Sequence, residues 1–128
     1  VLSQTPPING IIRATKSFGR DPVDGSSDAS WRERLSTIFT SFLLARPYYM
    51  QVRFIGVADG GRELVRVNRN VDWIEVGTPE ALQAKGDEAY FLDALQTQAG
   101  EIHFSEVTYN REQGNLDNAL VPTVRAIT

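Results

Sequence analysis

The sequence lacks cysteine and has a single histidine, His103, among its 128 residues. Without cysteine, disulfide frameworks, cysteine–zinc sites, iron–sulfur clusters and cysteine nucleophiles are excluded. A zinc site built on one histidine is not expected either, so we expect no cofactor and no tightly bound catalytic metal. The compartment stays open, because a cysteine-free chain suits a bacterial periplasmic domain and also many cytosolic ones.

Long hydrophobic runs and strong net charge are lacking as well. No segment approaches the roughly 20 apolar residues that span a bilayer. The formal net charge is −3, from 13 basic and 16 acidic residues, so we expect no nucleic-acid partner, which would need a strongly basic surface. The length suits one domain, residues 1–128. Because the chain has no initiator Met and closes in a predicted strand, we expect it to be a fragment of a longer membrane protein.

The N-terminal part, residues 1–47, is predicted to be helical. A first helix is expected from Thr5-Pro6-Pro7 to about residue 18, since proline is tolerated in a first helical turn. A second is expected over 31–45, with a capping box formed by Ser30 and Glu33 and an end before Pro47. Apolar residues recur in it at spacings of three and four, which predicts a buried stripe: Trp31, Leu35, Ile38, Phe39 and Phe42.

Between these helices, residues 19–30 are rich in Gly, Pro, Asp and Ser, which predicts a loop. Asp21, Asp24 and Asp28 recur there with a spacing that resembles a calcium site. The pattern of an EF-hand is not met, so we expect a solvated loop.

The remaining part, residues 48–128, is predicted to form the sheet core. Strands at about 49–58 and 62–68 flank a turn at Asp59-Gly60-Gly61, which predicts a hairpin. The segments that follow are expected to be irregular at 69–78, helical from Thr78 and over 89–98, extended at 101–109, polar and turn-rich at 110–118, and extended at 120–128. This order predicts one α+β domain, a four- or five-stranded antiparallel sheet with the 31–45 helix on one face.

Short stretches in a fixed order resemble a known family. The chain is similar to the extracytoplasmic sensor region of bacterial histidine kinases and diguanylate cyclases, the Cache type with PAS-like modules of the double-PDC arrangement. Each stretch is short, and the ordered set carries the resemblance: residues 2–8, 31–35, 38–39, 49–55, 61–67, 82–85, 89–91, 100–102 and 110–112.

The resemblance implies a PAS-like antiparallel sheet flanked by helices, with an N-terminal helical segment. It also implies a location: the periplasmic part of an inner-membrane protein of signal transduction, as the membrane-distal module. Transmembrane helices and a second module would flank it in the full-length protein, which would carry a cytoplasmic kinase or cyclase domain. The resemblance also implies that the protein could form a homodimer.

Arg53 and Arg66 are the first candidates for ligand binding. If the hairpin pairs symmetrically about residues 60–61, the two lie near each other on one face. Two guanidinium groups could hold a ligand carboxylate. The alternative is a surface cross-strand network with Glu63 and other acids.

Four further candidates lie later in the chain. The resemblance makes the connection after the hairpin a pocket wall, which points to Lys85 and Tyr90. Trp73 could close over a ligand, and Ser105 could form the pocket floor. Core packing is the alternative for Tyr90, as it is for Trp31 on the apolar helix face. Tyr48 and Tyr49 could also line a cavity.

Three functions stay open. The leading one is an input domain that binds a small anionic ligand, such as an organic acid, or a periplasmic partner protein, and does no chemistry itself. The second is a small α+β enzyme with a cone-shaped pocket, which needs a buried acid; Asp72, Glu75 and Asp93 are available. The third is a structural dimerisation module. A hydrolytic set of His103, Ser105 and Glu101 is not expected, because no nucleophile motif accompanies it.

Overall fold

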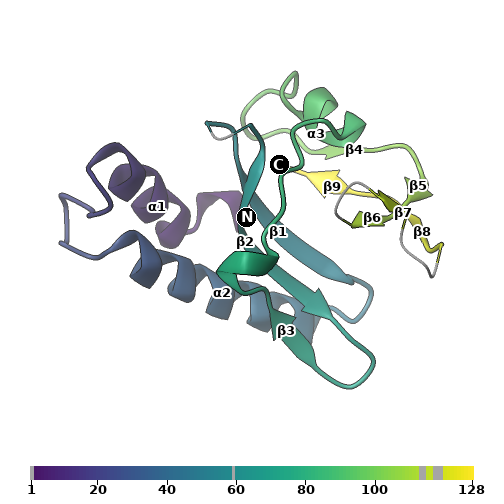
Figure 1. Ribbon diagram of the computed structural model, residues 1–128, viewed down its shortest axis with the longest axis horizontal. Coiled ribbons are helices and arrows are strands. Elements are labelled where there is room, and N and C mark those ends of the chain that lie inside the picture. The colour runs from purple at the N-terminus through teal and green to yellow at the C-terminus, as the bar shows by residue number, and fades with distance from the viewer. Residues whose placement is uncertain (1, 59, 113–114, 117–119) are drawn as a thin grey trace. The chain divides into compact units, whose positions relative to one another are not determined.

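The computed structural model describes residues 2–58, 60–112, 115–116 and 120–128 (Figure 1). The chain divides into two compact units. The first unit is the chain up to Ile55 together with Glu63–Leu82, and the second is Gly56–Arg62 together with Gln83–Thr128. Asp59 of the predicted turn, and parts of the predicted polar segment 110–118, lie outside the described residues.

The first unit opens with helices. A short 3₁₀ turn, η1 (Leu2–Gln4), precedes α1 (Pro6–Lys16), which begins at the predicted proline pair. Helix α2 (Asp28–Ala45) begins one turn earlier than predicted. Its cap is Ser27, whose Oγ accepts a hydrogen bond of 3.1 Å from the backbone N–H of Ser30. The prediction of Ser30 as the cap was therefore wrong, because an equally good capping residue stands three positions earlier.

The core of the first unit lies between α1, α2 and the sheet. The predicted stripe of α2 faces it: Trp31, Leu35 and Phe39 are buried, Ile38 and Phe42 are partly buried, and Leu43 joins them. Residues Ile8, Ile11 and Ala14 of α1 pack against this stripe, with Val65 and Val67 of the sheet. Gly10 lets the helices approach, since a Cβ there would lie 2.3 Å from two carbons of the Trp31 ring.

The sheet has three strands in the order β1-β2-β3. β1 (Gln51–Gly56) and β2 (Arg62–Arg69) form the predicted hairpin, which is confirmed. β3 (Ile74–Val76) pairs antiparallel with β2, and Val67 lies opposite Val76. The prediction of an irregular segment at 69–78 was wrong, because a three-residue strand is too short to show an alternating pattern. A 3₁₀ turn, η2 (Pro79–Ala81), follows β3.

The second unit holds one helical turn and a ribbon of short ladders. Helix α3 (Ala89–Ala94) ends earlier than the predicted 89–98. The ladders pair β4 (His103–Phe104) with β9 (Ala126–Ile127), β5 (Thr108–Tyr109) with β8 (Pro122–Thr123), and β6 (Arg111–Glu112) with β7 (Asn115–Leu116).

Each of the two long strands predicted at the C-terminal end is therefore split. Five positions separate His103 from Thr108, but only four separate their partners Ile127 and Thr123. One strand thus carries an extra residue, as in a β-bulge, which interrupts the ladder and bends the ribbon. A single four- or five-stranded sheet was predicted; in the described part of the chain the strands form one three-stranded sheet and three two-stranded ladders.

Candidate functional site

Arg53 and Arg66 meet on one carboxylate in the first unit. Arg53 Nε lies 3.2 Å from Glu63 Oε1, and Arg66 Nη1 lies 3.2 Å from Glu63 Oε2. Glu63 is fully buried, and the two arginine side chains are only 11% and 9% exposed. We call these three residues the arginine–glutamate cluster. The contact expected for a cross-strand network with Glu63 is present, but it is buried rather than at the surface.

The strand register explains why the two arginines come together. The N–H of Arg69 donates to the carbonyl of Met50, at 2.7 Å, and the side chain of Gln51 donates to that of Asn68. Both contacts imply a register in which Arg53 lies opposite Arg66. Like charges at opposite positions of neighbouring strands destabilise a sheet. The carboxylate of Glu63 offsets this repulsion by contacting both.

Trp73 lies in the first unit too, just before β3. It is 60% exposed, and its neighbour Val71 is 98% exposed. Tyr48 is also exposed, while Tyr49 packs its ring 5.2 Å from that of Phe42. Trp31 lies in the core, as predicted if it packs on the apolar face of its helix rather than lining a ligand cavity.

Lys85 is buried in the second unit, with 2% of its surface exposed. Its Nζ donates to the carbonyl oxygen of Arg111 at 3.0 Å, and its backbone N–H donates to the carbonyl of Gly61 at 2.7 Å. Gly61 and Gly86 lie in close backbone contact beside it, since a Cβ on Gly61 would come within 2.6 Å of Gly86. Lys85 therefore joins the hairpin tip to the β6 strand.

Tyr90 and Ser105 are linked through a residue that the sequence did not single out, Arg125. Its guanidinium stacks 4.6 Å from the ring centre of Tyr90 and donates to Thr108 Oγ1 at 2.9 Å. Its backbone N–H donates to Ser105 Oγ at 3.0 Å. Arg125 lies in the predicted last strand, and no motif around it in the sequence marks it as a binding residue. Its contacts arise only from the pairing of strands in the folded ribbon.

A polar chain continues from Arg125 across the second unit. Arg125 Nη2 lies 3.5 Å from Asn110 Oδ1, and Asn110 Nδ2 donates to Glu112 Oε1 at 2.9 Å. Gln83 Nε2 donates to the other oxygen of Glu112 at 2.7 Å. Hydrogen bonds thus connect Arg125 with Gln83, which lies 42 positions earlier in the sequence, through Asn110 and Glu112.

The six predicted site residues divide between the two units. Arg53, Arg66 and Trp73 belong to the first, and Lys85, Tyr90 and Ser105 to the second. Within the first unit the structure brings Arg53 and Arg66 together. Within the second, Arg125 links Tyr90 to Ser105. One pocket lined by all six stays a prediction.

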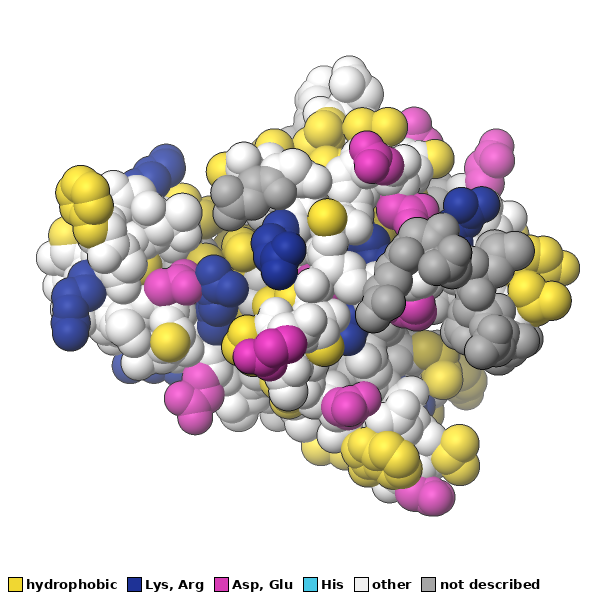
Figure 2. All heavy atoms as spheres, viewed as in Figure 1, with side chains coloured by type: hydrophobic (Ala, Val, Ile, Leu, Met, Phe, Trp, Pro, Cys, Tyr) yellow, Lys and Arg dark blue, Asp and Glu magenta, His cyan; other side chains and the backbone are white. Residues whose placement is uncertain are grey.

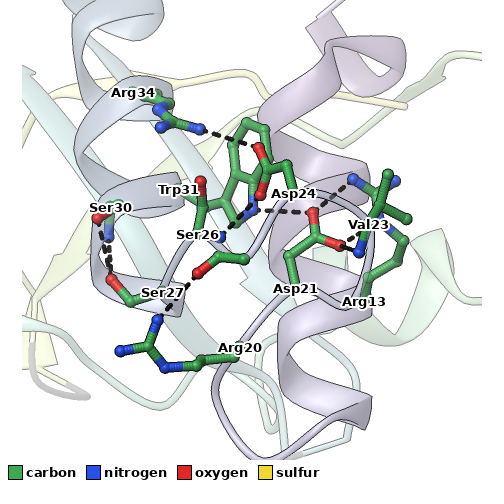
Figure 3. A network of polar contacts seen from close by, with 11 residues as sticks. Arg13, Arg20, Asp21, Val23, Asp24, Ser26, Ser27, Ser30, Trp31 and Arg34 are labelled. Carbon is green, nitrogen blue, oxygen red and sulfur yellow. Dashed lines mark hydrogen bonds and ion pairs between the residues drawn. The ribbon is translucent and has the colours of Figure 1, made fainter.

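A second polar network lies in the first unit around Asp21 (Figure 3). Arg13 donates to both carboxylate oxygens, from Nε at 2.8 Å and from Nη2 at 2.6 Å. Trp31 Nε1 donates at 3.0 Å and the backbone N–H of Val23 at 2.9 Å. The bonds from Arg13 are the main cause that lowers the pKa of Asp21 to about 2. The prediction of a wholly solvated loop was wrong here, since Asp21 is only 1% exposed.

The other two acids of the calcium-like pattern, Asp24 and Asp28, also form ion pairs with arginines. Asp28 contacts Arg32 at 2.7 Å, and Asp24 contacts Arg34 at 3.7 Å. The guanidinium of Arg34 also lies 4.3 Å above the Trp31 ring. Each carboxylate of the calcium-like pattern thus has an internal cation. Among the described residues, no group of three or more His, Asp or Glu side chains is placed to hold a metal ion.

None of the predicted site residues lines either of two surface depressions. One, of about 410 Å³ in the second unit, is lined by Asp93, Gln96, Thr97, Glu101, Ile102 and His103. The other, of about 430 Å³ in the first unit, is lined by Glu33, Ser36, Thr37, Thr40, Ser41 and Val76.

Within the described residues, none of the helices combines the length and the apolar character needed to cross a membrane.

Comparison with known proteins supplies the family and the fold. The family of bacterial histidine kinase sensor domains matches residues 23–128. The extracellular domain of vpHK1S-Z8, a protein assigned as a histidine kinase, is similar with a TM-score of 0.77 and 19% identity, over 98% of this chain and 40% of that one. A domain of a sensory box/GGDEF family protein from Vibrio parahaemolyticus is similar with a TM-score of 0.77 and 20% identity, over 98% and 42%.

These two likenesses confirm the predicted α+β fold of antiparallel sheets and helices. The chain spans less than half the length of either solved chain. No curated protein matches the sequence.

Proposed function

We propose that this chain, which belongs to the family of bacterial histidine kinase sensor domains, is the extracytoplasmic ligand-sensing input domain of a transmembrane signalling protein. The family match over residues 23–128 is the observation that carries this proposal. The two structural neighbours include an extracellular domain, which supports a periplasmic location. The flanking transmembrane helices, a kinase or diguanylate cyclase output and a homodimeric assembly belong to the same proposal.

The arginine–glutamate cluster is the proposed centre for binding a small anion. Two guanidinium groups and one carboxylate carry a formal charge of +1 in a nearly buried place on the sheet. A guanidinium presents planar donors that fit a carboxylate in a two-point contact. An organic acid is therefore the ligand class that this cluster favours. Trp73 of the same unit, and Lys85, Tyr90 and Ser105 of the second, remain further proposed ligand contacts.

The cluster also provides a way to convert binding into a signal. A ligand changes a conformational equilibrium only when its contacts differ between the two states. A ligand carboxylate that pairs with Arg53 and Arg66 competes with Glu63 for the same donors. Since Glu63 lies at the start of β2 and Arg53 in β1, this competition would act on the β1–β2 hairpin.

The proposed module carries out no reaction. The acids that an enzyme would need, Asp72, Glu75 and Asp93, are exposed rather than buried. Among the residues that the structure describes, the buried acids are Asp21 and Glu63, and both contact arginines. No feature of the described residues favours the enzyme over the binding module.

The test begins with a thermal-shift screen of organic acids on the complete extracellular region, since a ligand that binds the folded state raises Tm. Calorimetry then compares Arg53→Lys and Arg66→Lys with Arg20→Lys, a matched control whose side chain donates to Gly25 in an exposed loop. Lysine keeps the charge opposite Glu63 but loses the two-point geometry. We expect weaker binding by about 1.5–3 kcal/mol in the first two variants. Unchanged affinity in both, with Tm retained, would place the ligand elsewhere.

A further inference from the structure

Phe18 is the most exposed of the large hydrophobic residues that the structure describes, with a relative exposure of 106%. It lies in the loop that leads from helix α1 to helix α2. Its φ angle of 56° is in the left-handed region, which costs free energy in any residue that carries a Cβ. A ring so exposed gains no packing energy within the described chain to offset this cost. Strained residues of this kind are typical of functional sites.

The strain arises because Phe18 occupies the position that ends α1. The N–H of Gly19 donates to the carbonyl of Ala14 at 2.8 Å. This is the hydrogen bond of a Schellman motif, in which the preceding residue is left-handed and is usually glycine or asparagine. Here glycine comes one position later, and phenylalanine takes the left-handed position. The helix would end with less strain if this residue were glycine, so ending the helix does not explain the aromatic ring.

The backbone that carries Phe18 is held in place by hydrogen bonds. The N–H of Arg20 donates to the carbonyl of Ser17 at 3.2 Å. The buried carboxylate of Asp21 then anchors the loop to α1 through Arg13 (Figure 3). A side chain on a fixed backbone loses less conformational freedom when it binds a partner, which favours affinity.

The positions beside Phe18 are basic. Lys16 and Arg20 lie two positions before and after it, and both are exposed. In the part of the chain that the structure describes, neither forms an ion pair, and Arg20 donates to the carbonyl of Gly25. The two acids of this loop, by contrast, each contact another arginine. The unpaired positive charge beside Phe18 therefore favours an acidic surface as its partner.

We propose that Phe18 and its flanking cations dock a separate protein whose surface offers an apolar pocket bordered by Asp or Glu side chains. One buried aromatic residue can dominate the free energy of a protein interface, whereas stable attachment to a membrane needs a larger apolar surface or a second signal. Two copies that met through this surface would bring like charges together, which disfavours self-association. The proposal goes beyond the binding of a small anion and does not depend on it.

Photo-cross-linking of the full-length protein, in cells of the bacterium that encodes it, tests for this partner. p-Benzoylphenylalanine replaces Phe18 in one variant and Phe104, which is 65% exposed in the second unit, in the matched control. We expect position 18, and not 104, to cross-link to a peptide of another protein that carries Asp or Glu beside apolar residues. A product with lipid, with the same polypeptide or with a second copy would overturn the proposal. No product, or equal products from both positions, would do so too.

Lys16 tests the role of charge in the same cross-link. Lys16→Glu should reduce the product at least about tenfold, because like charges would then face each other across the interface. Lys16→Arg keeps the charge and should retain the product. Equal products from the two variants would overturn the assignment of an acidic partner.

Phe18→Gly separates docking from a structural role. Glycine adopts the left-handed conformation without strain, so the Tm of the complete extracellular region should be retained or raised. Calorimetry with the protein that cross-linking identifies should show an affinity lower by at least about 30-fold, as for a central aromatic anchor. A lowered Tm would show that the ring stabilises the fold, and an unchanged affinity would remove it from the interface. Either result would overturn the proposal.

Discussion

The two units of this protein are stabilised in different ways. Of the ten buried hydrophobic residues among those described, nine belong to the first unit and only Phe91 to the second. The first unit has long helices that present a continuous apolar stripe to a sheet. The second has strands of two residues, joined by side-chain hydrogen bonds around Arg125 and Lys85.

Large exposed hydrophobic side chains, by contrast, occur in both units. The ribbon of the second unit leaves large apolar side chains in solvent, and others are visible on the face shown in Figure 2. Those of the ribbon are between 47% and 68% exposed: Ile102, Phe104, Val107, Tyr109, Val121 and Val124. Apolar burial therefore stabilises the first unit, where nine of the ten buried hydrophobic residues lie, whereas the second relies more on polar contacts.

The largest expected effect tests this comparison with one substitution made in each unit. Phe39 is 2% exposed and Phe104 is 65% exposed. Phe39→Ala should lower the free energy of unfolding by about 3–5 kcal/mol, because it removes buried surface and leaves a cavity. Phe104→Ala should change it by no more than about 0.5 kcal/mol. Urea unfolding of residues 1–128, followed by far-ultraviolet circular dichroism, to which both units contribute, measures both. Equal losses would show that the contrast in burial does not govern stability.

The next effect concerns acid and the Asp21 network. The pKa of Asp21 is about 2 in the folded protein, against about 3.9 for an unfolded aspartate. A lowered pKa contributes stability that is fully present above the unfolded value and is lost as pH falls from about 5 toward 2. Thermal midpoints across this range should therefore fall more steeply for the wild type than for Asp21→Asn, which cannot titrate.

Asp24→Asn is the control for that titration, because its side chain is 42% exposed and its contact with Arg34 is 3.7 Å long. It should leave the pH dependence nearly unchanged. If Asp21→Asn and Asp24→Asn behave alike, the buried network is not what makes the first unit sensitive to acid.

A smaller effect is expected at the contact between the two helices. Gly10→Ala should destabilise the protein by about 1–3 kcal/mol, because the new methyl group overlaps the Trp31 ring and overpacking forces shifts. Helix propensity alone would favour alanine by about 1 kcal/mol. Asn9→Ala, at the exposed neighbouring position, should be neutral or stabilising. A stabilised Gly10→Ala variant would show that the helices can separate without cost.

The smallest effect is expected in the second unit. Arg125→Gln removes the stacking on Tyr90, and a cation over an aromatic ring at a partly exposed site contributes about 0.5–1 kcal/mol. We expect faster hydrogen exchange of the Ser105 amide, which donates to the carbonyl of Arg125, and partial recovery in Arg125→Lys. Unchanged exchange would mean that the backbone ladder holds the ribbon without this side chain.

The helices and the hairpin could be predicted because their signals are local. The apolar residues of α2 recur at a helical period, and its stripe is buried as expected. The hairpin strands flank a glycine pair, which predicts the turn. Symmetry about residues 60–61 would place Arg53 opposite Asn68, whereas the bond from the N–H of Arg69 to Met50 places Arg53 opposite Arg66. A contact of Glu63 with Arg53 and Arg66 could also be predicted as an alternative, since all three residues lie on the same hairpin.

The remaining elements depend on partners distant in the sequence. Strand β3 has three residues, and the strands of the ribbon have two each, so none is long enough to show a period. The bulge that divides the ribbon exists only in the pairing of two strands. The role of Arg125 follows from this pairing, because its contacts Tyr90, Ser105 and Thr108 lie 17 to 35 positions away.

The α+β class, the two helices with their buried stripe, the hairpin and the resemblance to sensor domains could all be predicted from the sequence. These rest on periodicity, turn residues and an ordered set of short motifs, all of which are properties of neighbouring residues. Only the tertiary structure decided that Asp21 is buried against Arg13 and Trp31, that Glu63 contacts two arginines, and that Arg125 links the ribbon. The physical reason is that burial and charge pairing depend on which surfaces meet, and those surfaces are formed by segments far apart in the chain.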